Sequence, residues 1–206
     1  QTLVSSRFPP LWLGTARAII ACLLFCHPTQ STAAITAVWK PPMRFWLLDR
    51  ICSYAPHTQL TAVKNVSLAE EYLGDHFPEF PVLPGVFMLE AATQSCAWLI
   101  RLSEDFAHNI VVLHEARAIK YADFVTPGNQ LVIKVQQTKK DDRLTHFRFT
   151  GEVEDRISVS GRLVLERYNL GDSDPRQSDL DRRMVELQKQ QAKLLTYGID
   201  SAVGVS

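Results

Sequence analysis

The most constraining feature of the sequence is the fifteen-residue run VFMLEAATQSCAWLI, from Val86 to Ile100, which is apolar on nearly every face of a helix. Pro84 and Gly85 precede it, and proline is common at the start of a helix. A helix that is apolar all round is buried. We therefore expect a long helix over about 84–107 that is wrapped by a curved sheet.

Shorter runs with alternating apolar residues surround this helix and predict strands. The expected α+β fold has one long helix lying on an antiparallel sheet. The strands are expected over 59–66, 110–119, 130–137, 144–154 and 157–167, with a short helical turn over 68–72.

Composition excludes several classes of protein. The 206 residues contain 22 Lys+Arg and 22 Asp+Glu, with 46% hydrophobic residues. This balance is typical of a globular protein and gives no general electrostatic argument for nucleic-acid binding. The four cysteines form no C-x-x-C pair, so zinc or thioredoxin-like chemistry has no support. We expect reduced thiols in a cytoplasmic protein.

Both ends of the chain differ from its centre. Residues 1–42 contain no Asp or Glu, and the apolar run Leu11–Cys26 is broken by Arg17. That run is too short for a membrane span, so no stable membrane insertion is expected. The segment loosely resembles a signal or transit peptide. The alternative is that Met43 is the true start and that 1–42 is upstream sequence.

The remaining chain divides into a domain over 43–170 and a C-terminal extension over 171–206. The polar stretch GDSDPRQSD, residues 171–179, is typical of a linker. Ser178 is expected to cap a modest amphipathic helix that stops near Gly198. Its predicted packing stripe consists of Leu180, Met184, Leu187 and Leu194.

Chemistry is indicated by the loop before the long helix and by the acid within the helix. His76 lies in the loop DHFPEFPVLPG, whose prolines restrict the backbone around it. Gly85 has no Cβ, so a ligand can approach the free N–H groups at the helix start. Glu90 follows about 7.5 Å along the axis, at 1.5 Å per residue. A base, a buried acid and amide donors are the groups needed to remove a proton beside a carbonyl and expel a hydroxyl.

The stretch HFPEFPVLPGVFMLEAATQ, from His76 to Gln94, closely resembles the β-hydroxyacyl-[acyl-carrier-protein] dehydratases of the FabZ type. LLDRI and AVKNVS upstream, and VTPGNQL downstream, extend the resemblance over about 120 residues. It implies a hot-dog fold, working as a homodimer or a trimer of dimers, with no metal and no redox cofactor. Each site would lie at the dimer interface, with the histidine from one protomer and the acid from the other.

The resemblance also implies the roles of particular residues. His76 would remove the α-proton of a (3R)-3-hydroxyacyl chain on acyl carrier protein, and Glu90 would assist loss of the β-hydroxyl. Gly85, Val86, Gln94 and Phe80 would bind substrate, with the Gly85 N–H holding the thioester carbonyl. Gln94, one helical turn beyond Glu90, would orient it. A glutamate at position 90 favours the FabZ type over the isomerising FabA type.

Some features depart from the family or leave its details open. Glu79 stands where the family commonly has glycine, which bears on substrate entry, and the C-terminal helix is additional. Two alternative roles, lining an acyl tunnel and packing in the core, remain for a set of apolar residues: Phe80, Phe87, Met88, Trp98 and Phe124. A basic rim for an acidic carrier protein would draw on Arg101, Lys120, Lys139, Lys140 and Arg143.

Two other functions remain open. A hot-dog acyl-CoA thioesterase would need an activated water, and the spacing of His76 and Glu90 speaks against it. A non-catalytic protein that binds acyl chains or a carrier protein is the second alternative. Turnover of a 3-hydroxyacyl substrate would distinguish a dehydratase from both alternatives.

Overall fold

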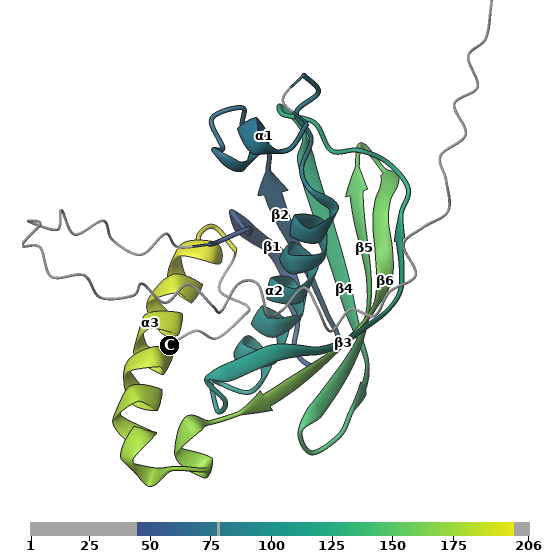
Figure 1. Cartoon of the computed structure of the whole chain (residues 1–206). Coiled ribbons are helices and arrows are strands. Elements are labelled where there is room, and N and C mark those ends of the chain that lie inside the picture. The colour runs from purple at the N-terminus through teal and green to yellow at the C-terminus, as the bar shows by residue number, and fades with distance from the viewer. Residues whose placement is uncertain (1–44, 78, 200–206) are drawn as a thin grey trace, which may run out of the picture. The chain divides into compact units, whose positions relative to one another are not determined.

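The structure is a computed structural model that describes residues 45–77 and 79–199, with the side chain of Asp75 excepted. Six antiparallel strands form one sheet in the order β1-β2-β4-β5-β6-β3, and the long helix α2 lies against one face of it (Figure 1). The strands are β1 (Arg50–Ala55), β2 (Gln59–Asn65), β3 (Ile110–Tyr121), β4 (Gln130–Lys140), β5 (Leu144–Val153) and β6 (Arg156–Tyr168). The helices are α1 (Tyr72–Asp75), α2 (Gly85–Ser103) and α3 (Ser178–Leu195), with short 3-10 turns η2 (Leu170–Asp172) and η3 (Pro175–Gln177) before α3.

The core forms where α2 meets the concave face of the sheet. Alternate residues of the central strands point at the helix, and the helix supplies small side chains that let the strands approach closely. The largest of these side chains, including Phe147, Phe149 and Leu163, are fully buried, as are Ala91 and Cys96 on α2. This arrangement is the hot-dog fold, so the predicted α+β class and the wrapped helix are confirmed.

At the start of the domain, one element was displaced from its predicted place and one was missed. The short helix α1 spans Tyr72–Asp75 instead of 68–72. Strand β1 was not predicted, because only Ile51 in its sequence is fully buried and the alternation is therefore weak. It pairs with β2 at the edge of the sheet.

Strand β3 forms the opposite edge and contains a bulge that the sequence did not indicate. Its pairing with β6 shifts register between Arg117 and Lys120, and Ala118 has a φ of 52°. A positive φ is unusual for a residue with a Cβ. The bulge redirects the last residues of the strand, which end at Tyr121.

The C-terminal helix α3 forms as predicted, but its cap and its packing face differ from the prediction. Gln177 is the N-cap residue, and the Ser178 hydroxyl donates instead to the carbonyl of Pro175 at 2.8 Å. The side chains facing the domain are those of Val185, Ala192 and Leu195, whereas Leu180, Leu187 and Leu194 are exposed.

Polar contacts also hold α3 to the segment after α2. The Asp181 carboxylate accepts from the backbone N–H groups of Leu170 and Gly171, at 3.1 and 2.7 Å, and from the Asn109 amide. The Gln188 amide donates to the Asn109 carbonyl at 2.8 Å. Of the predicted stripe, Met184 is half-buried, with its sulfur 4.0 Å from the Asn109 amide nitrogen. Its three leucines were predicted wrongly, because these polar anchors set the rotation of the helix.

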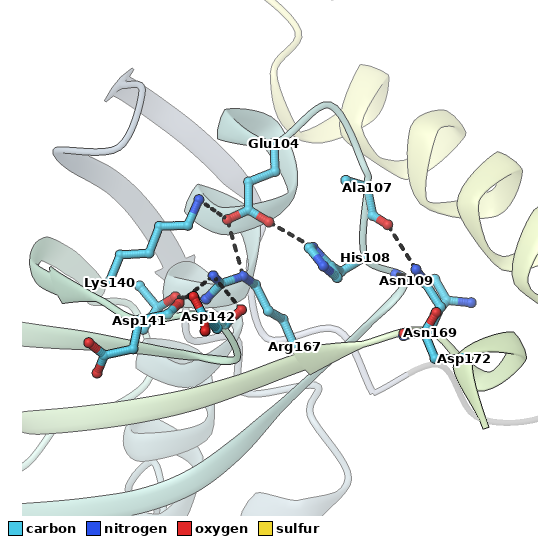
Figure 2. Close-up of polar contacts among 11 residues, drawn as sticks. Glu104, Ala107, His108, Asn109, Lys140, Asp141, Asp142, Arg167, Asn169 and Asp172 are labelled. Atoms are coloured by element: carbon cyan, nitrogen blue, oxygen red, sulfur yellow. Dashed lines mark hydrogen bonds and ion pairs between the residues drawn. The ribbon is translucent and has the colours of Figure 1, made fainter.

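The carboxyl end of α2 is held by a group of charges around Glu104 (Figure 2). The Glu104 carboxylate lies 2.8 Å from Lys140 Nζ, 2.8 Å from His108 Nδ1 and 3.3 Å from Arg167 Nε. The buried Arg167 donates in turn to the carbonyls of Asp141 and Asp142. It also donates to Thr145 Oγ1 at 2.6 Å. This group, the Glu104 cluster, joins the helix end to the β4–β5 turn and to β6.

The expected features of residues 1–42, including Cys22 and Cys26, lie outside the described residues. Cys52 and Cys96 are free. Within residues 45–77 and 79–199, none of the helices has the length and apolar character needed to cross a membrane.

Candidate active site

His76 lies in the loop between α1 and α2 and is half-buried. Its backbone is extended, with φ −116° and ψ 102°, so the chain leaves α1 at this residue. The neighbouring ring of Phe77 lies 4.5 Å from the imidazole between centroids, and Phe77 has a φ of 52°. A left-handed backbone at a bulky residue is strained, and such strain persists only where the surroundings impose it. The loop therefore holds the imidazole in a defined place.

The same loop is tied to the sheet before α2 begins. The N–H of Leu83 donates to the carbonyl of Val125 at 2.8 Å, and the adjacent side chains of Val82 and Leu83 are buried. Pro84 is the N-cap residue and Gly85 is the first residue of α2, as predicted. This anchorage fixes the position of the helix start relative to the connection between β3 and β4.

The first turn of α2 offers free amide donors. The N–H groups of Phe87 and Met88 both donate to the carbonyl of Pro84, at 2.9 and 3.2 Å. No acceptor lies within hydrogen-bond distance of the Gly85 or Val86 N–H among the described residues, and the first turn has no acidic side chain. Two amides and the positive end of the helix dipole are therefore available to an electron-rich oxygen.

An aromatic side chain that the sequence analysis missed lies against this helix start. The ring of Tyr121, at the end of β3, is so close to Gly85 that a Cβ built there would lie 3.0 to 3.3 Å from three ring atoms. Tyr121 is half exposed, and burial of its phenol raises its pKa. No sequence signal marks this residue, because its position depends on the bulge in β3.

Glu90 lies on the next turns of α2 and is partly buried. Removal from water raises the pKa of its carboxyl, and a hydrogen bond from Gln94 offsets part of that rise. The Gln94 amide nitrogen lies 3.0 Å from Glu90 Oε1. The group is therefore more easily protonated than an exposed glutamate.

Gln94 connects this acid to the start of the domain. Its amide nitrogen also donates to the carbonyl of Phe45 at 3.1 Å, and its Oε1 accepts from the N–H of Leu47 at 3.1 Å. Both ends of the side-chain amide are thus in use, which fixes its orientation. In this orientation the Gln94 amide nitrogen points at the Glu90 carboxylate.

The structure brings some predicted site residues together and keeps others apart. Gly85, Val86, Glu90 and Gln94 follow one another along α2, and His76 lies in the loop that leads into it. Within one chain, no hydrogen bond or ion pair links His76 to Glu90 among the described residues, and the only hydrogen-bond partner of the Glu90 carboxylate there is Gln94. Glu79 is exposed and forms no ion pair in the described part of the chain.

The five apolar side chains considered for an acyl tunnel separate into two groups. Phe80 and Phe124 are exposed and touch edge to face, with ring centroids 5.9 Å apart. Met88 and Trp98 are buried in the core, and Phe87 packs between Phe45 and Tyr72. Only the first two therefore lie at the surface beside the loop of His76.

The basic side chains considered for a docking rim are mostly occupied. Arg101 lies over the ring of Trp98, and its burial lowers its pKa to about 10. Lys120 is exposed, without an ion pair in the described ranges. The other three are held in ion pairs: Lys139 with Asp141, Lys140 with Glu104 and Arg143 with Glu166.

Comparison with known proteins adds a family to this geometry. Residues 40–166 match the FabA-like domain. The chain is 38% identical over 127 residues to a 3-hydroxyacyl-[acyl-carrier-protein] dehydratase FabZ of Legionella pneumophila, covering 58% of this chain and 82% of that protein. It is 36% identical over 125 residues to the FabZ of Neisseria meningitidis, with the same coverage of 58% and 82%.

A solved structure shows the same fold. The dehydratase heterocomplex ApeI:P from Xenorhabdus doucetiae contains a chain that superposes with a TM-score of 0.52 at 21% sequence identity. The match covers 61% of this chain and 84% of that one.

Proposed function

The chain belongs to the FabA-like domain family, and on that premise we propose that it dehydrates (3R)-3-hydroxyacyl chains carried by an acyl carrier protein. The product is the trans-2-enoyl thioester and one water. The observation that carries the proposal is the acid on α2: Glu90 is partly buried with a raised pKa, and it follows a helix start with two free amides.

The roles follow from the chemistry that each group can perform. His76 takes the α-proton, and the electron pair left behind moves toward the thioester carbonyl. The Gly85 and Val86 N–H groups stabilise the negative charge on that oxygen. The electrons then form the α–β double bond, and Glu90 gives a proton to the departing β-hydroxyl. Proton exchange with water returns His76 to its neutral form and Glu90 to its acid form.

The protonated form of Glu90 is the form that this step requires. Burial favours the neutral carboxyl because charge is poorly solvated away from water. Gln94 accounts for the orientation of the carboxyl, since its other contacts anchor it to Phe45 and Leu47. Phe80 would contact the acyl chain at the surface beside His76.

We further propose that the working unit is a homodimer, or a trimer of dimers. Large apolar side chains are exposed around the helix start, namely those of Phe77, Phe80, Val86, Tyr121 and Phe124. An exposed apolar patch of this kind is typical of an interface. Strand β3, of 12 residues, also forms one edge of the sheet among the described residues, and such edges readily pair with another chain. A second copy would bring its Glu90 toward His76. A cytoplasmic location is part of the proposal and is supported by the free thiols of Cys52 and Cys96.

The test is an assay of the full chain with 3-hydroxybutyryl acyl carrier protein, following enoyl thioester absorbance and free thiol. We expect enoyl product without thiol release, and a loss of at least about 100-fold in kcat for Glu90→Gln and for His76→Asn. Glu186→Gln, at an exposed position of α3, serves as a matched change at a distance from the site. Thiol release would instead identify a thioesterase. Carrier binding without turnover by a folded wild-type protein would support a non-catalytic binding protein.

A further inference from the structure

The outer side of α3 carries three leucines in a line. Leu180, Leu187 and Leu194 follow one another at intervals of seven residues, and 48%, 60% and 67% of their surface is exposed. Seven residues make nearly two full turns of a helix, so the three side chains extend along about 21 Å of one side at 1.5 Å per residue. Tyr197, just beyond the helix, is 84% exposed. We call the three leucines the leucine row.

The leucine row faces away from its own domain. The contacts that hold α3 come from other positions of the helix: Ala192 and Leu195 are buried, and Asp181 and Gln188 bond to Asn109. These anchors set the rotation of the helix, so the row cannot turn inward without breaking them. A row of apolar side chains left in water marks a surface that meets another one.

The exposed residues beside the row continue the heptad pattern of a helix that pairs with another helix. With the leucines at position a of the heptad, Arg183 and Gln190 occupy position d, and Glu186 and Lys193 occupy position g. All four are exposed. A stripe confined to these positions is the narrow seam of a two-helix contact, whereas a helix that lies on a membrane presents a wider apolar face. The pattern therefore favours a helix as the partner.

We propose that α3 pairs antiparallel with α3 of a second copy of this chain, and that this contact joins two of the proposed dimers. Antiparallel pairing brings position a of one helix against position d of the other. In one register each leucine of the row meets a residue of the partner's seam: Leu187 with the partner's Gln190, Leu180 with the partner's Tyr197 and Leu194 with the partner's Arg183. Each contact occurs twice, because a two-fold axis relates the copies. The inference rests on the proposed function for the dimer that it extends.

Charge complementarity supports this orientation. In the same register Glu186 lies opposite the partner's Lys193, and Lys193 lies opposite the partner's Glu186, so two ion pairs flank the seam. Among the described residues, Glu186 accepts only from the Gln190 amide, at 3.1 Å, and Lys193 forms no ion pair. Parallel pairing would instead bring Arg183 against the partner's Arg183, and like charges repel.

Arg183 favours the antiparallel direction for a second reason. It is exposed and forms no ion pair in the described part of the chain. Antiparallel pairing places it beside the last turn of the partner's α3, where the final carbonyls lack intrahelical donors and carry the negative end of the helix dipole. Its aliphatic stem can cover the partner's Leu194 while the guanidinium stays in water.

The size of the contact predicts how strongly it holds. A helix of 18 residues is about 27 Å long and about 10 Å wide, so the pair buries roughly 500 Å² in total. This is less than the about 1,200 Å² of a stable interface between independent proteins. Each proposed dimer carries two copies of α3, so a closed assembly uses the contact more than once. We therefore expect association of dimers that depends on concentration.

Charge reversal tests the contact, with the mass of the full chain measured by sedimentation velocity over a range of concentrations. The wild type should associate beyond the dimer. Lys193→Glu faces the partner's Glu186 with a like charge and should raise the dissociation constant between dimers at least about tenfold. The double swap Glu186→Lys with Lys193→Glu restores both opposite pairs and should restore association. Neutralising one exposed partner has little effect, so the test reverses the charge.

The matched control is Glu154→Lys, a reversal at an exposed position of the β5–β6 turn, which should leave association unchanged. Added salt should weaken association of the wild type and of the double swap alike. A wild type that never exceeds the dimer, an unchanged mass in Lys193→Glu, or a double swap that stays dissociated contradicts the proposal.

Disulfide formation tests the direction of the two helices. Positions 180 and 197 lie about 25 Å apart along one chain, too far for a disulfide within it, yet they face each other in the antiparallel pair. Leu180→Cys combined with Tyr197→Cys should give a covalent dimer under mild oxidation, at a level above that of the wild type and of either single variant. A covalent dimer from Leu180→Cys alone indicates parallel pairing and overturns the proposal.

The contact and the proposed function can fail separately. Turnover of 3-hydroxybutyryl acyl carrier protein by Lys193→Glu should stay within twofold of wild type, because α3 carries none of the candidate site residues. A pair of chains that Lys193→Glu reduces to monomers would support the α3 contact and count against the β3 dimer. Absence of turnover in an associated wild type counts against the dehydratase alone. Binding of phosphatidylglycerol vesicles that Leu187→Glu abolishes, in a chain that does not associate, makes a membrane the occupant of the row and overturns the proposal.

Discussion

The two ends of helix α2 are built in opposite ways. At the carboxyl end, Glu104 is surrounded by Lys140, His108 and Arg167 (Figure 2). The Arg167 guanidinium also donates to Thr145 and to two backbone carbonyls. At the amino end, the Gly85 and Val86 amides have no acceptor among the described residues, and the nearby aromatic side chains are exposed.

The difference separates stability from chemistry within one element. A polar group whose partners all come from the protein contributes to stability and has no capacity left for a ligand. Free amides weaken a helix end, but they can stabilise charge that develops during a reaction. The carboxyl end of α2, which we call the closed end, thus fixes the helix in the sheet. The amino end, which we call the open end, keeps its N–H donors for substrate.

The largest effect should come from breaking the closed end. Glu104→Gln removes the charge that neutralises Arg167, which is itself buried. Removing one partner of a buried ion pair costs about 3 kcal/mol. We expect the free energy of unfolding in urea to fall by about that amount, with kcat nearly unchanged. Glu186→Gln, on the exposed side of α3, should have almost no effect, and an equal loss in both variants would refute the assignment.

This loss should also depend on pH in a defined direction. Burial would raise the pKa of Glu104, but hydrogen bonds from Lys140 and His108 and the charge of Arg167 more than offset this and lower it. A carboxyl with a lowered folded-state pKa stabilises the protein above its unfolded-state pKa and loses this contribution as pH falls through the folded-state value. The stability difference between wild type and Glu104→Gln should therefore be full at pH 7 and shrink below about pH 4. A constant difference down to pH 3 would contradict this account.

A smaller effect, confined to activity, should follow from filling the space between Gly85 and the Tyr121 ring at the open end. Gly85→Ala places a Cβ 3.0 Å from the Tyr121 ring, while alanine suits a helix better than glycine. We expect kcat/KM to fall about tenfold, equivalent to about 1.4 kcal/mol, with no loss of thermal stability. Tyr121→Ala in the same chain removes the crowded ring and should recover part of the activity. A loss that the second change does not relieve would place the obstruction elsewhere.

The smallest effect should come from removing the hydrogen bond that Gln94 donates to Glu90. Gln94→Ala removes the hydrogen bond that lowers the pKa of Glu90, so that pKa rises further. Because Glu90 acts in its protonated form, the alkaline limb of the kcat profile assigned to it should move to higher pH, and kcat at neutral pH should change only a few-fold. An unshifted limb with a large loss of stability would make Gln94 a structural residue only.

The sequence allowed the centre of this fold to be predicted better than its edges. The central strands and α2 were predicted because burial on one face or all round leaves a clear pattern, as in Leu131, Ile133 and Val135. Strand β1 left no such pattern. The rotation of α3 was predicted from its leucines and was wrong, because Asp181 and Gln188 decide it through contacts with Asn109.

The site shows the same division. His76, Gly85 and Glu90 lie in one continuous motif, so the sequence indicated them together. Tyr121 approaches Gly85 only because β3 bends at Ala118. Contacts of this kind are set by tertiary pairing and leave no local signal.

The place of β3 in the sheet determines when the domain can close during synthesis. In the chain, β3 follows α2 directly, yet within the described sheet its one partner is β6, the last of those strands to be made. Until residue 168 has left the ribosome, β3 has no partner strand and α2 lacks the part of its cover that β6 provides. While β4 and β5 are being translated, the part of α2 that β6 will cover thus stays exposed. Protection of that intermediate, by a chaperone or by rapid elongation, becomes part of what this topology requires.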